Sequence, residues 1–165
     1  MRPRHRPVAV LSLGLAAVAL VGACSRGAGT ESTPPPDSPV ALTDEARQVL
    51  DQHLGEQWQL VSGTVDDKAI EPVEGELVTF GAGRDPEGDL GIGGHVCNDF
   101  GLTVEGERAG DLVSTAMLCP DDLMALEGAV MRALPRIADV IVDGDTMTLA
   151  GDGVDLTLTT VTEAS

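Results

Sequence analysis

Positive charge is scarce in this sequence. Ten Lys and Arg residues stand against 27 Asp and Glu residues in a chain of 165, which gives a formal net charge of −17. So acidic a surface repels phosphate backbones and anionic headgroups alike, and we therefore expect no nucleic-acid partner. Two interpretations of the excess acid stay open: it keeps the protein soluble at a cell surface, or it recruits cations or a basic partner.

Aromatic side chains are almost absent, since the chain has two Phe, one Trp and no Tyr. We expect the single tryptophan, Trp58, to anchor the hydrophobic core, because a large apolar side chain is most stable when buried. The alternative is that Trp58 lies on a binding face.

The sequence also lacks an apolar run long enough to cross a membrane. The run over residues 8–23 has 16 residues, whereas a spanning helix needs about 20. A basic segment precedes this run, as in an export signal, and Val21-Gly22-Ala23-Cys24 ends it. That ending resembles the lipobox of bacterial lipoproteins. We therefore predict a signal peptide over residues 1–23 and a lipid on Cys24 that anchors the protein to the outer face of the cell membrane. Ordinary secretion, with Cys24 left free, is the alternative.

Removal of the signal peptide makes the mature protein more acidic. Arg2, Arg4 and Arg6 are lost with it, so that seven basic side chains remain against 27 acidic ones and the formal net charge becomes −20. Residues 24–41 then form the lipidated cysteine and a tether, because this stretch is rich in Gly, Ser, Thr and Pro and has little to bury. A folded domain is expected over residues 42–162.

Cysteine is scarce as well, with three in the chain. If Cys24 carries the lipid, Cys97 and Cys119 remain, and outside the cytoplasm we expect them to form one disulfide bond. It would close a loop of a little more than twenty residues, worth about 3 kcal/mol by loop entropy. The alternatives are a reactive thiol or a metal site. Neither cysteine has a Cys-x-x-Cys partner or a nearby second histidine, which weighs against both.

Two segments have the pattern of amphipathic helices. The first, over residues 43–54, begins with Thr43 as a capping hydroxyl and has acidic residues in its first turn. The second begins near Pro120, and we expect Pro135 to end it at about Leu134. The apolar residues of its buried face are Leu123, Leu126, Val130 and Leu134.

The remaining pattern is that of short strands separated by turns. Strands are expected over residues 58–61, 76–80, 89–95, 102–104, around Leu112, over 115–117, and in a final meander over 140–142, 146–149 and 154–159. Turns are expected over residues 81–88, 105–107 and 109–111. Asp143-Gly144 is a strong signal for a two-residue hairpin turn.

No catalytic motif is recognisable in the sequence. No serine has a His and Asp companion by motif, and residues 81–88 lack the Gly-Lys-Ser/Thr ending of a phosphate-binding loop. Four aspartates lack the full spacing of a calcium loop and are explained by hairpin turns: Asp143, Asp145, Asp152 and Asp155. We therefore predict a protein that is not an enzyme and has no cofactor and no metal. A hydrolase is the third hypothesis after the two given below.

Several short motifs follow one another in a defined order. They are Trp58-Gln-Leu60, a Gly-rich strand running into Cys97-Asn98, Thr115-x-Met117-x-Cys119, Glu127, Leu134 and a hairpin that ends at Leu149. Over residues 55–161 this order resembles the META domain, as in HslJ-like proteins. The resemblance implies an α+β fold in which a strongly curved, partly barrel-like antiparallel sheet packs against one main helix, here with an additional short N-terminal helix. It also implies a general link to heat shock, envelope stress and antibiotic tolerance, without an established catalytic centre.

The residues of this signature have structural roles that their chemistry predicts. Asn98 tolerates unusual backbone angles and is expected to form a turn. Thr115 and Met117 alternate as in a strand, with Met117 in the core. Glu127 lies beside the buried helix face, where a capping or sheet-edge hydrogen bond is expected, and catalysis is the alternative. With Trp58, these residues are predicted to be structural.

The sequence thus leads to two hypotheses about function. The first is a lipid-anchored, non-enzymatic META-domain protein outside the cytoplasm, a monomer with a role in envelope maintenance or stress tolerance. The second is a surface binding or inhibitory module that recognises a protein or a cell-wall component.

Overall fold

The computed structural model describes residues 41–106 and 108–161. The predicted signal peptide, the lipid anchor at Cys24 and the tether lie outside these residues. None of the helices in the described part of the chain is both long enough and apolar enough to cross a membrane.

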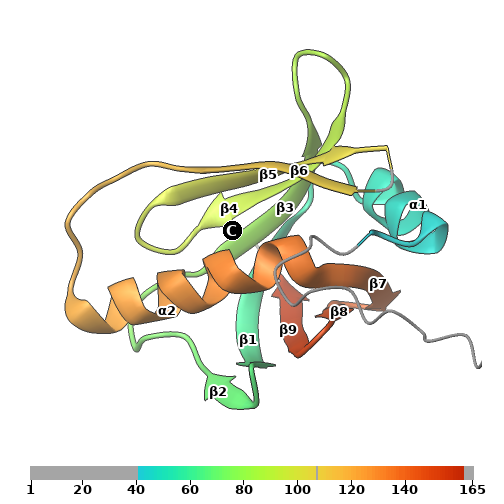
Figure 1. Ribbon diagram of the computed structural model, residues 1–165. Coiled ribbons are helices and arrows are strands. Elements are labelled where there is room, and N and C mark those ends of the chain that lie inside the picture. Colours follow the sequence, from blue (N-terminus) through green and yellow to red (C-terminus); the bar gives the residue numbers. More distant parts are fainter. Residues whose placement is uncertain (1–40, 107, 162–165) are drawn as a thin grey trace, which may run out of the picture. The chain divides into compact units, whose positions relative to one another are not determined.

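One curled antiparallel sheet of nine strands dominates the described residues (Figure 1). The strands are β1 (Gln57–Val65), β2 (Lys68–Ile70), β3 (Thr79–Arg84), β4 (Leu90–His95), β5 (Asp99–Glu105), β6 (Arg108–Ser114), β7 (Ile137–Asp143), β8 (Thr146–Gly151) and β9 (Val154–Thr160). Their order across the sheet is β6-β5-β4-β3-β1-β9-β8-β7, and β2 pairs with β1. The sheet curls into a half-barrel, so the α+β fold with a strongly curved sheet is confirmed.

The short helix α1 (Asp44–Gln52) confirms the predicted N-terminal helix. Thr43 caps it, because the Thr43 Oγ1 accepts a hydrogen bond from the backbone N–H of Ala46 at 3.1 Å. Ala46 and Leu50 bury one face of the helix. The backbone N–H of Thr43 donates to the carbonyl oxygen of Ala138 in β7 at 2.9 Å. These contacts fasten α1 to the β7 edge of the sheet.

The main helix α2 (Asp121–Ala133) lies across the curled sheet in Figure 1. Its buried residues include Leu123, Leu126 and Val130, the apolar face that the sequence predicts. The 3₁₀ helix η1 (Leu134–Arg136) follows directly and contains Pro135, which has no N–H to continue the α-helical pattern. The chain then enters β7.

The few aromatic side chains lie in the core. Trp58 is only 1 % exposed, so its predicted role as a core anchor is confirmed and a binding-face role is excluded. The rings of Phe80 and Phe100 meet edge to face, with centroids 5.4 Å apart, an arrangement that favours aromatic pairs.

Two strands extend through segments predicted to be turns. β3 begins at Thr79, not at residue 76, and runs on to Arg84, while β6 passes through residues 109–111. The short strand β2 was not predicted, and residues 115–117 form no strand. The turn predictions in β3 and β6 were wrong because glycine has a low intrinsic preference for strands, whereas pairing with neighbouring strands decides the outcome.

Glycine also allows β3 and β4 to approach closely. A Cβ atom on Gly94 would overlap the backbone carbonyl oxygen of Thr79 in the neighbouring strand. Glycine within a strand often marks such a close approach of another backbone.

The carboxyl-terminal part of the domain is the predicted three-stranded meander. β7 pairs with β8 and β8 with β9. Gly144, in the turn between β7 and β8, has a φ of 58°, and Gly153, in the next turn, has a φ of 63°. Both values lie in the left-handed region that glycine occupies without steric cost.

Candidate functional site

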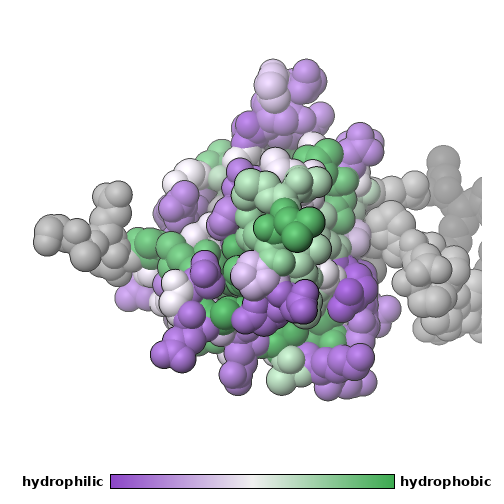
Figure 2. All heavy atoms as spheres, turned by 90° about the vertical axis from the view of Figure 1, so that its left-hand side faces the viewer, coloured by the Kyte–Doolittle hydropathy of each residue, from purple (hydrophilic) through white to green (hydrophobic). Residues whose placement is uncertain are grey.

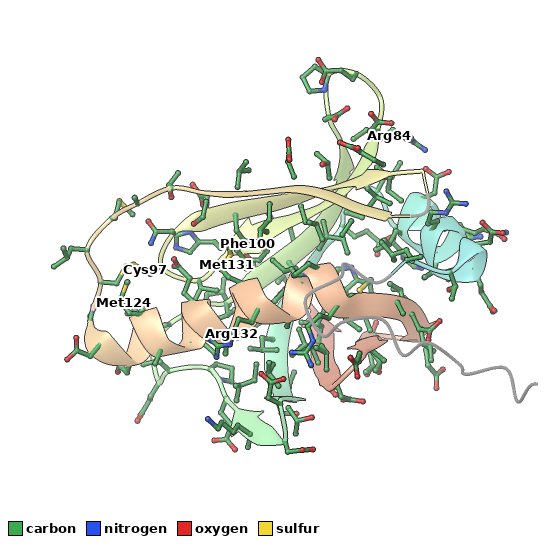
Figure 3. All side chains as sticks on the ribbon, viewed as in Figure 1. Arg84, Cys97, Phe100, Met124, Met131 and Arg132 are labelled. Carbon is green, nitrogen blue, oxygen red and sulfur yellow. A yellow bond between two sulfur atoms is a disulfide. The ribbon has the colours of Figure 1, made fainter. Side chains whose placement is uncertain are left out.

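Most of the predicted signature residues meet where the β4–β5 turn faces the start of α2. Cys97 and Cys119 form the predicted disulfide bond, with their Cα atoms 6.3 Å apart, a normal separation for such a bond. In Figure 3, Cys97 and Met124 lie at the same end of α2. We use the name Asn98 cluster for the residues that surround this bond: Cys97, Asn98, Thr115, Met117, Cys119 and Glu127.

The side chain of Asn98 is the centre of the cluster. Asn98 is 2 % exposed. Its Oδ1 accepts hydrogen bonds from the backbone N–H of Met117 at 2.6 Å and from Oγ1 of Thr115 at 3.2 Å. Its Nδ2 donates to Oε1 of Glu127 at 3.0 Å and to the carbonyl oxygen of Met117 at 3.4 Å. The predicted turn residue therefore also connects distant segments.

Glu127 is a buried carboxylate, only 9 % exposed. Its Oε2 accepts a hydrogen bond from the backbone N–H of Asn98 at 2.8 Å, as well as one from Nδ2 of Asn98 at 3.1 Å. Three N–H···O contacts compensate the loss of water around the carboxylate. The hydrogen bonds of Glu127 thus go to the β4–β5 turn, between two interior strands, and not to a helix cap or a sheet edge as expected.

Thr115 fixes the segment after β6 to the beginning of β5. Its backbone N–H donates to the carbonyl oxygen of Asp99 at 3.0 Å, and its Oγ1 accepts from the backbone N–H of Asp99 at 3.0 Å. The chain has left the sheet by this point, so the alternation of side chains between two faces ends. The prediction that Met117 lies in the core was wrong, since its side chain is 59 % exposed.

Metal binding was an alternative for the cysteines. Each sulfur of Cys97 and Cys119 lies within 4.8 Å of an oxygen of Glu127, and no other group of three such ligands occurs in residues 41–106 and 108–161. Metal ligation requires thiolates, and the two sulfur atoms are bonded to each other. The carboxylate oxygens already accept hydrogen bonds from Asn98. This arrangement fits a covalent link between segments better than a metal centre.

The four aspartates considered for calcium are not brought together. Asp143 and Asp145 lie at the turn that precedes β8, whereas Asp152 and Asp155 lie at and after the turn that follows it. Because the six residues of β8 separate the two pairs, the carboxylates occupy opposite ends of the strand and form no common site.

Two histidines pair with carboxylates at the surface, which sequence reasoning did not find. His95 Nδ1 lies 2.9 Å from Asp99 Oδ1, and His53 Nδ1 lies 2.9 Å from Glu56 Oε2. Their spacings of four and three residues could have indicated both pairs. A nucleophile activated by such a pair would have to be hydrogen-bonded to the imidazole. Among the described residues, no serine, threonine or cysteine side chain makes that bond.

A shallow hollow of about 600 Å³ lies over β3, β4 and β5. Four residues of these strands point into the core, namely Phe80, Ala82, Ile92 and Leu102. The residues that alternate with them therefore face outward. We call the outward surface the glycine hollow, because five glycines form its floor: Gly81, Gly83, Gly91, Gly93 and Gly101.

The strand register aligns these glycines across the sheet. Gly81 is opposite Gly93, and Gly93 is opposite Gly101. Acidic residues line the hollow too, namely Glu56, Asp85 and Asp111. The sequence shows glycine on one face of β4, but it does not give the register, and the hollow could not be predicted for that reason.

The comparisons with known proteins agree with this fold. The model of the META domain matches residues 51–163. Among curated proteins, none matches. The NMR structure of a protein from Burkholderia xenovorans is 24 % identical, with a TM-score of 0.55, and the match covers 76 % of this chain and 93 % of that one. A second NMR structure is 20 % identical, with a TM-score of 0.46, and the match covers 66 % of this chain and 92 % of the other chain.

Proposed function

This chain belongs to the META domain family, and we propose that it is a lipid-anchored protein outside the cytoplasm that serves envelope maintenance or stress tolerance without catalysing a reaction. The observation that carries the non-enzymatic part is the use of the signature residues. The polar side-chain atoms of Asn98, Thr115 and Glu127 form hydrogen bonds with one another and with the backbone. This use of their polar atoms supports a structural role for the three residues.

The location rests on the amino-terminal sequence. A basic segment, an apolar run and Val21-Gly22-Ala23-Cys24 support export followed by lipidation. Two acyl chains give stable anchoring, whereas a single chain does not. The tether that follows would then hold the acidic domain away from an anionic membrane surface.

A deletion strain tests this proposed function. Loss of the protein is expected to lower survival at high temperature and in drugs that act on the cell envelope, and the intact gene is expected to restore it. The variant Cys24→Ser should fail to restore survival if anchoring matters. A deletion strain that grows like its parent under all these stresses would contradict the proposal.

A binding or inhibitory module is the second candidate, and the glycine hollow favours it. Its volume of about 600 Å³ falls in the range of ligand sites. A Cβ on Gly83 would meet no atom within 4 Å, and one on Gly101 would lie 3.6 Å from a methyl group of Val113. Packing within the domain therefore does not require glycine at these two positions.

Filling the hollow tests the second candidate. Gly83→Leu and Gly101→Val should leave the domain folded but abolish its ability to restore survival in the deletion strain. Gly128→Ala, on α2 and outside the hollow, is the matched control and should restore survival fully. If the two filled variants restore survival like the control, the hollow is not a binding site.

A further inference from the structure

The segment between β6 and α2 presents apolar side chains to solvent. Leu118 is fully exposed, Met117 is 59 % exposed, and Met124, in the first turns of α2, is 46 % exposed. We call these three residues the Leu118 patch. Figure 2 views the domain from the end where this segment lies, and it shows hydrophobic atoms at the centre of the face with hydrophilic atoms around them.

The main chain beneath these side chains is firmly held. The backbone N–H of Met117 donates to Oδ1 of Asn98 at 2.6 Å, and Cys119 is tied to Cys97 by the disulfide bond. Leu118 lies between these two fixed points. A surface that is ordered before binding loses less conformational entropy when a partner arrives. The exposed leucine is thus pre-organised for contact.

Negative charge borders the patch. Asp121 and Asp122 follow it directly and are exposed, and the side chain of Asp99, at the neighbouring β4–β5 turn, is exposed as well. No Lys or Arg occurs between Arg108 and Arg132. The surroundings therefore favour a partner with positive charge around its own contact area.

We propose that the Leu118 patch docks a protein partner through a segment that carries apolar side chains flanked by Lys and Arg. Protein interfaces commonly combine a central apolar anchor, often with methionine, and a polar rim. A second copy of this chain would bring like charges together, and anionic headgroups would also be repelled. This inference is independent of the glycine hollow and of the envelope role.

A displayed library of random dodecapeptides, selected on the intact chain and in parallel on its Leu118→Ser variant, tests the proposal. Peptides that prefer the unchanged chain should carry apolar residues flanked by Lys or Arg. A synthesised representative should bind Leu118→Ser about tenfold more weakly or worse, and added salt should weaken its binding to the unchanged chain.

Ile141→Ser is the control, because Ile141 is another exposed apolar residue, 59 % exposed, and lies on β7, outside the patch. This variant should bind the peptide like the unchanged chain, and Leu118→Met should largely retain binding. The proposal is overturned if no peptide distinguishes Leu118→Ser from the unchanged chain, or if the preferred peptides lack basic residues. Leu118-dependent dimers in light scattering, or Leu118-dependent binding to phosphatidylglycerol vesicles, would overturn it in favour of another occupant.

Thr115 acts as a positioning residue for the patch, and its role can be measured separately. Thr115→Val removes the hydroxyl that donates to Asn98 and accepts from Asp99. The folded variant should bind the peptide more weakly, and hydrogen exchange at the Met117 amide should become faster, with rescue by Thr115→Ser. Unchanged affinity together with a faster exchange rate would show that loop order does not contribute to docking.

Discussion

At the scale of single residues, Asn98 links three segments that are distant in sequence. Its backbone forms the β4–β5 turn, its Oδ1 holds the segment before α2, and its Nδ2 reaches Glu127 within α2. The bonds to Glu127 are buried, whereas those to Thr115 and Met117 are partly buried, so water does not readily replace the partner that Glu127 would lose. The contribution of Asn98 to stability should therefore exceed that of an ordinary turn residue.

We predict that Asn98→Ala destabilises the domain by about 3 kcal/mol, because the carboxylate of Glu127 loses both hydrogen bonds from Nδ2 and keeps only the one from the backbone N–H, while the N–H of Met117 loses its acceptor. Chemical denaturation monitored by Trp58 fluorescence measures this. Thr103→Ala, which changes a partly buried hydroxyl outside the cluster, is the comparison and should cost less. A loss for Asn98→Ala no larger than for the comparison would contradict the role assigned to Asn98.

Asn98 and Glu127 should also be energetically coupled. In a double-mutant cycle with Asn98→Ala and Glu127→Ala, the two losses should fail to add by about 1 kcal/mol or more, since either change alone removes the hydrogen bonds between Nδ2 of Asn98 and the carboxylate of Glu127. Additive losses in the measured free energies of unfolding would mean that the two side chains act separately.

The sequence predicts some of these residue roles and not others. Cys97 and Cys119 were paired correctly, because once Cys24 is assigned to the lipid only one pairing remains. The partners of Asn98 are not predictable from a local pattern, since they depend on how α2 packs near the β4–β5 turn. Met117 was misplaced because the strand alternation was extended beyond Ser114, where the strand ends.

At the scale of secondary-structure elements, the disulfide bond connects Cys97 in the β4–β5 turn to Cys119, which lies just before α2. The linked cysteines are 22 residues apart in sequence. The bond therefore lowers the conformational entropy of the unfolded chain. In the folded domain it joins the turn that precedes β5 to the start of the main helix. We therefore expect the bond to stabilise both the β4–β5 hairpin and α2.

Replacing both cysteines, Cys97→Ser with Cys119→Ser, should cost about 3 kcal/mol by loop entropy and lower the Tm by about 10 °C or more. Differential scanning calorimetry of the double variant and of the oxidised protein measures the shift. Reduction of the unchanged protein should give a similar shift. An unaltered Tm in both cases would show that the bond contributes little to stability.

Two glycines in adjacent strands should respond differently to the same substitution. Gly94→Ala places a methyl group against the carbonyl oxygen of Thr79 and should destabilise the domain by about 3 kcal/mol. Gly83→Ala meets no neighbour within 4 Å, so its stability should change little or rise by about 0.5 kcal/mol. Equal effects in urea unfolding would contradict the close approach of β3 and β4.

Elements with local signals were predicted well. The Thr43 cap, the Pro135 stop and the Asp143-Gly144 turn each act within a few residues, and α1, α2 and the β7–β9 meander follow from them. β3 and β6 depend instead on the strands beside them. The two glycines of β3 and the Ala109-Gly110-Asp111 sequence of β6 resemble turns until the partner strands are known.

At the scale of the whole molecule, charge and anchoring act together. The predicted mature chain has a formal net charge of −20, and like charges repel it from anionic surfaces. Without a covalent lipid, such a protein would diffuse away from the membrane. The proposed anchor at Cys24 therefore decides where the acidic domain resides.

We predict that the intact protein is recovered in the membrane fraction and stays there in high salt, which removes proteins held by charge alone. Cys24→Ser should appear in the soluble or secreted fraction, and mass spectrometry should find the lipid mass only on the unchanged chain. Recovery of Cys24→Ser with the membranes would contradict lipid anchoring.

The pairing of β1 with β9 at the middle of the sheet governs when this domain can fold. β1 begins at Gln57 and its neighbour β9 ends at Thr160, so the centre of the sheet must wait until nearly all of the described chain has been made. Contacts so far apart in sequence form slowly. Until β9 arrives, the two halves of the sheet have no shared edge, and β1 lacks one of its two neighbours in the order across the sheet. A signal peptide such as the one proposed here would therefore begin export while the centre of the sheet is still incomplete.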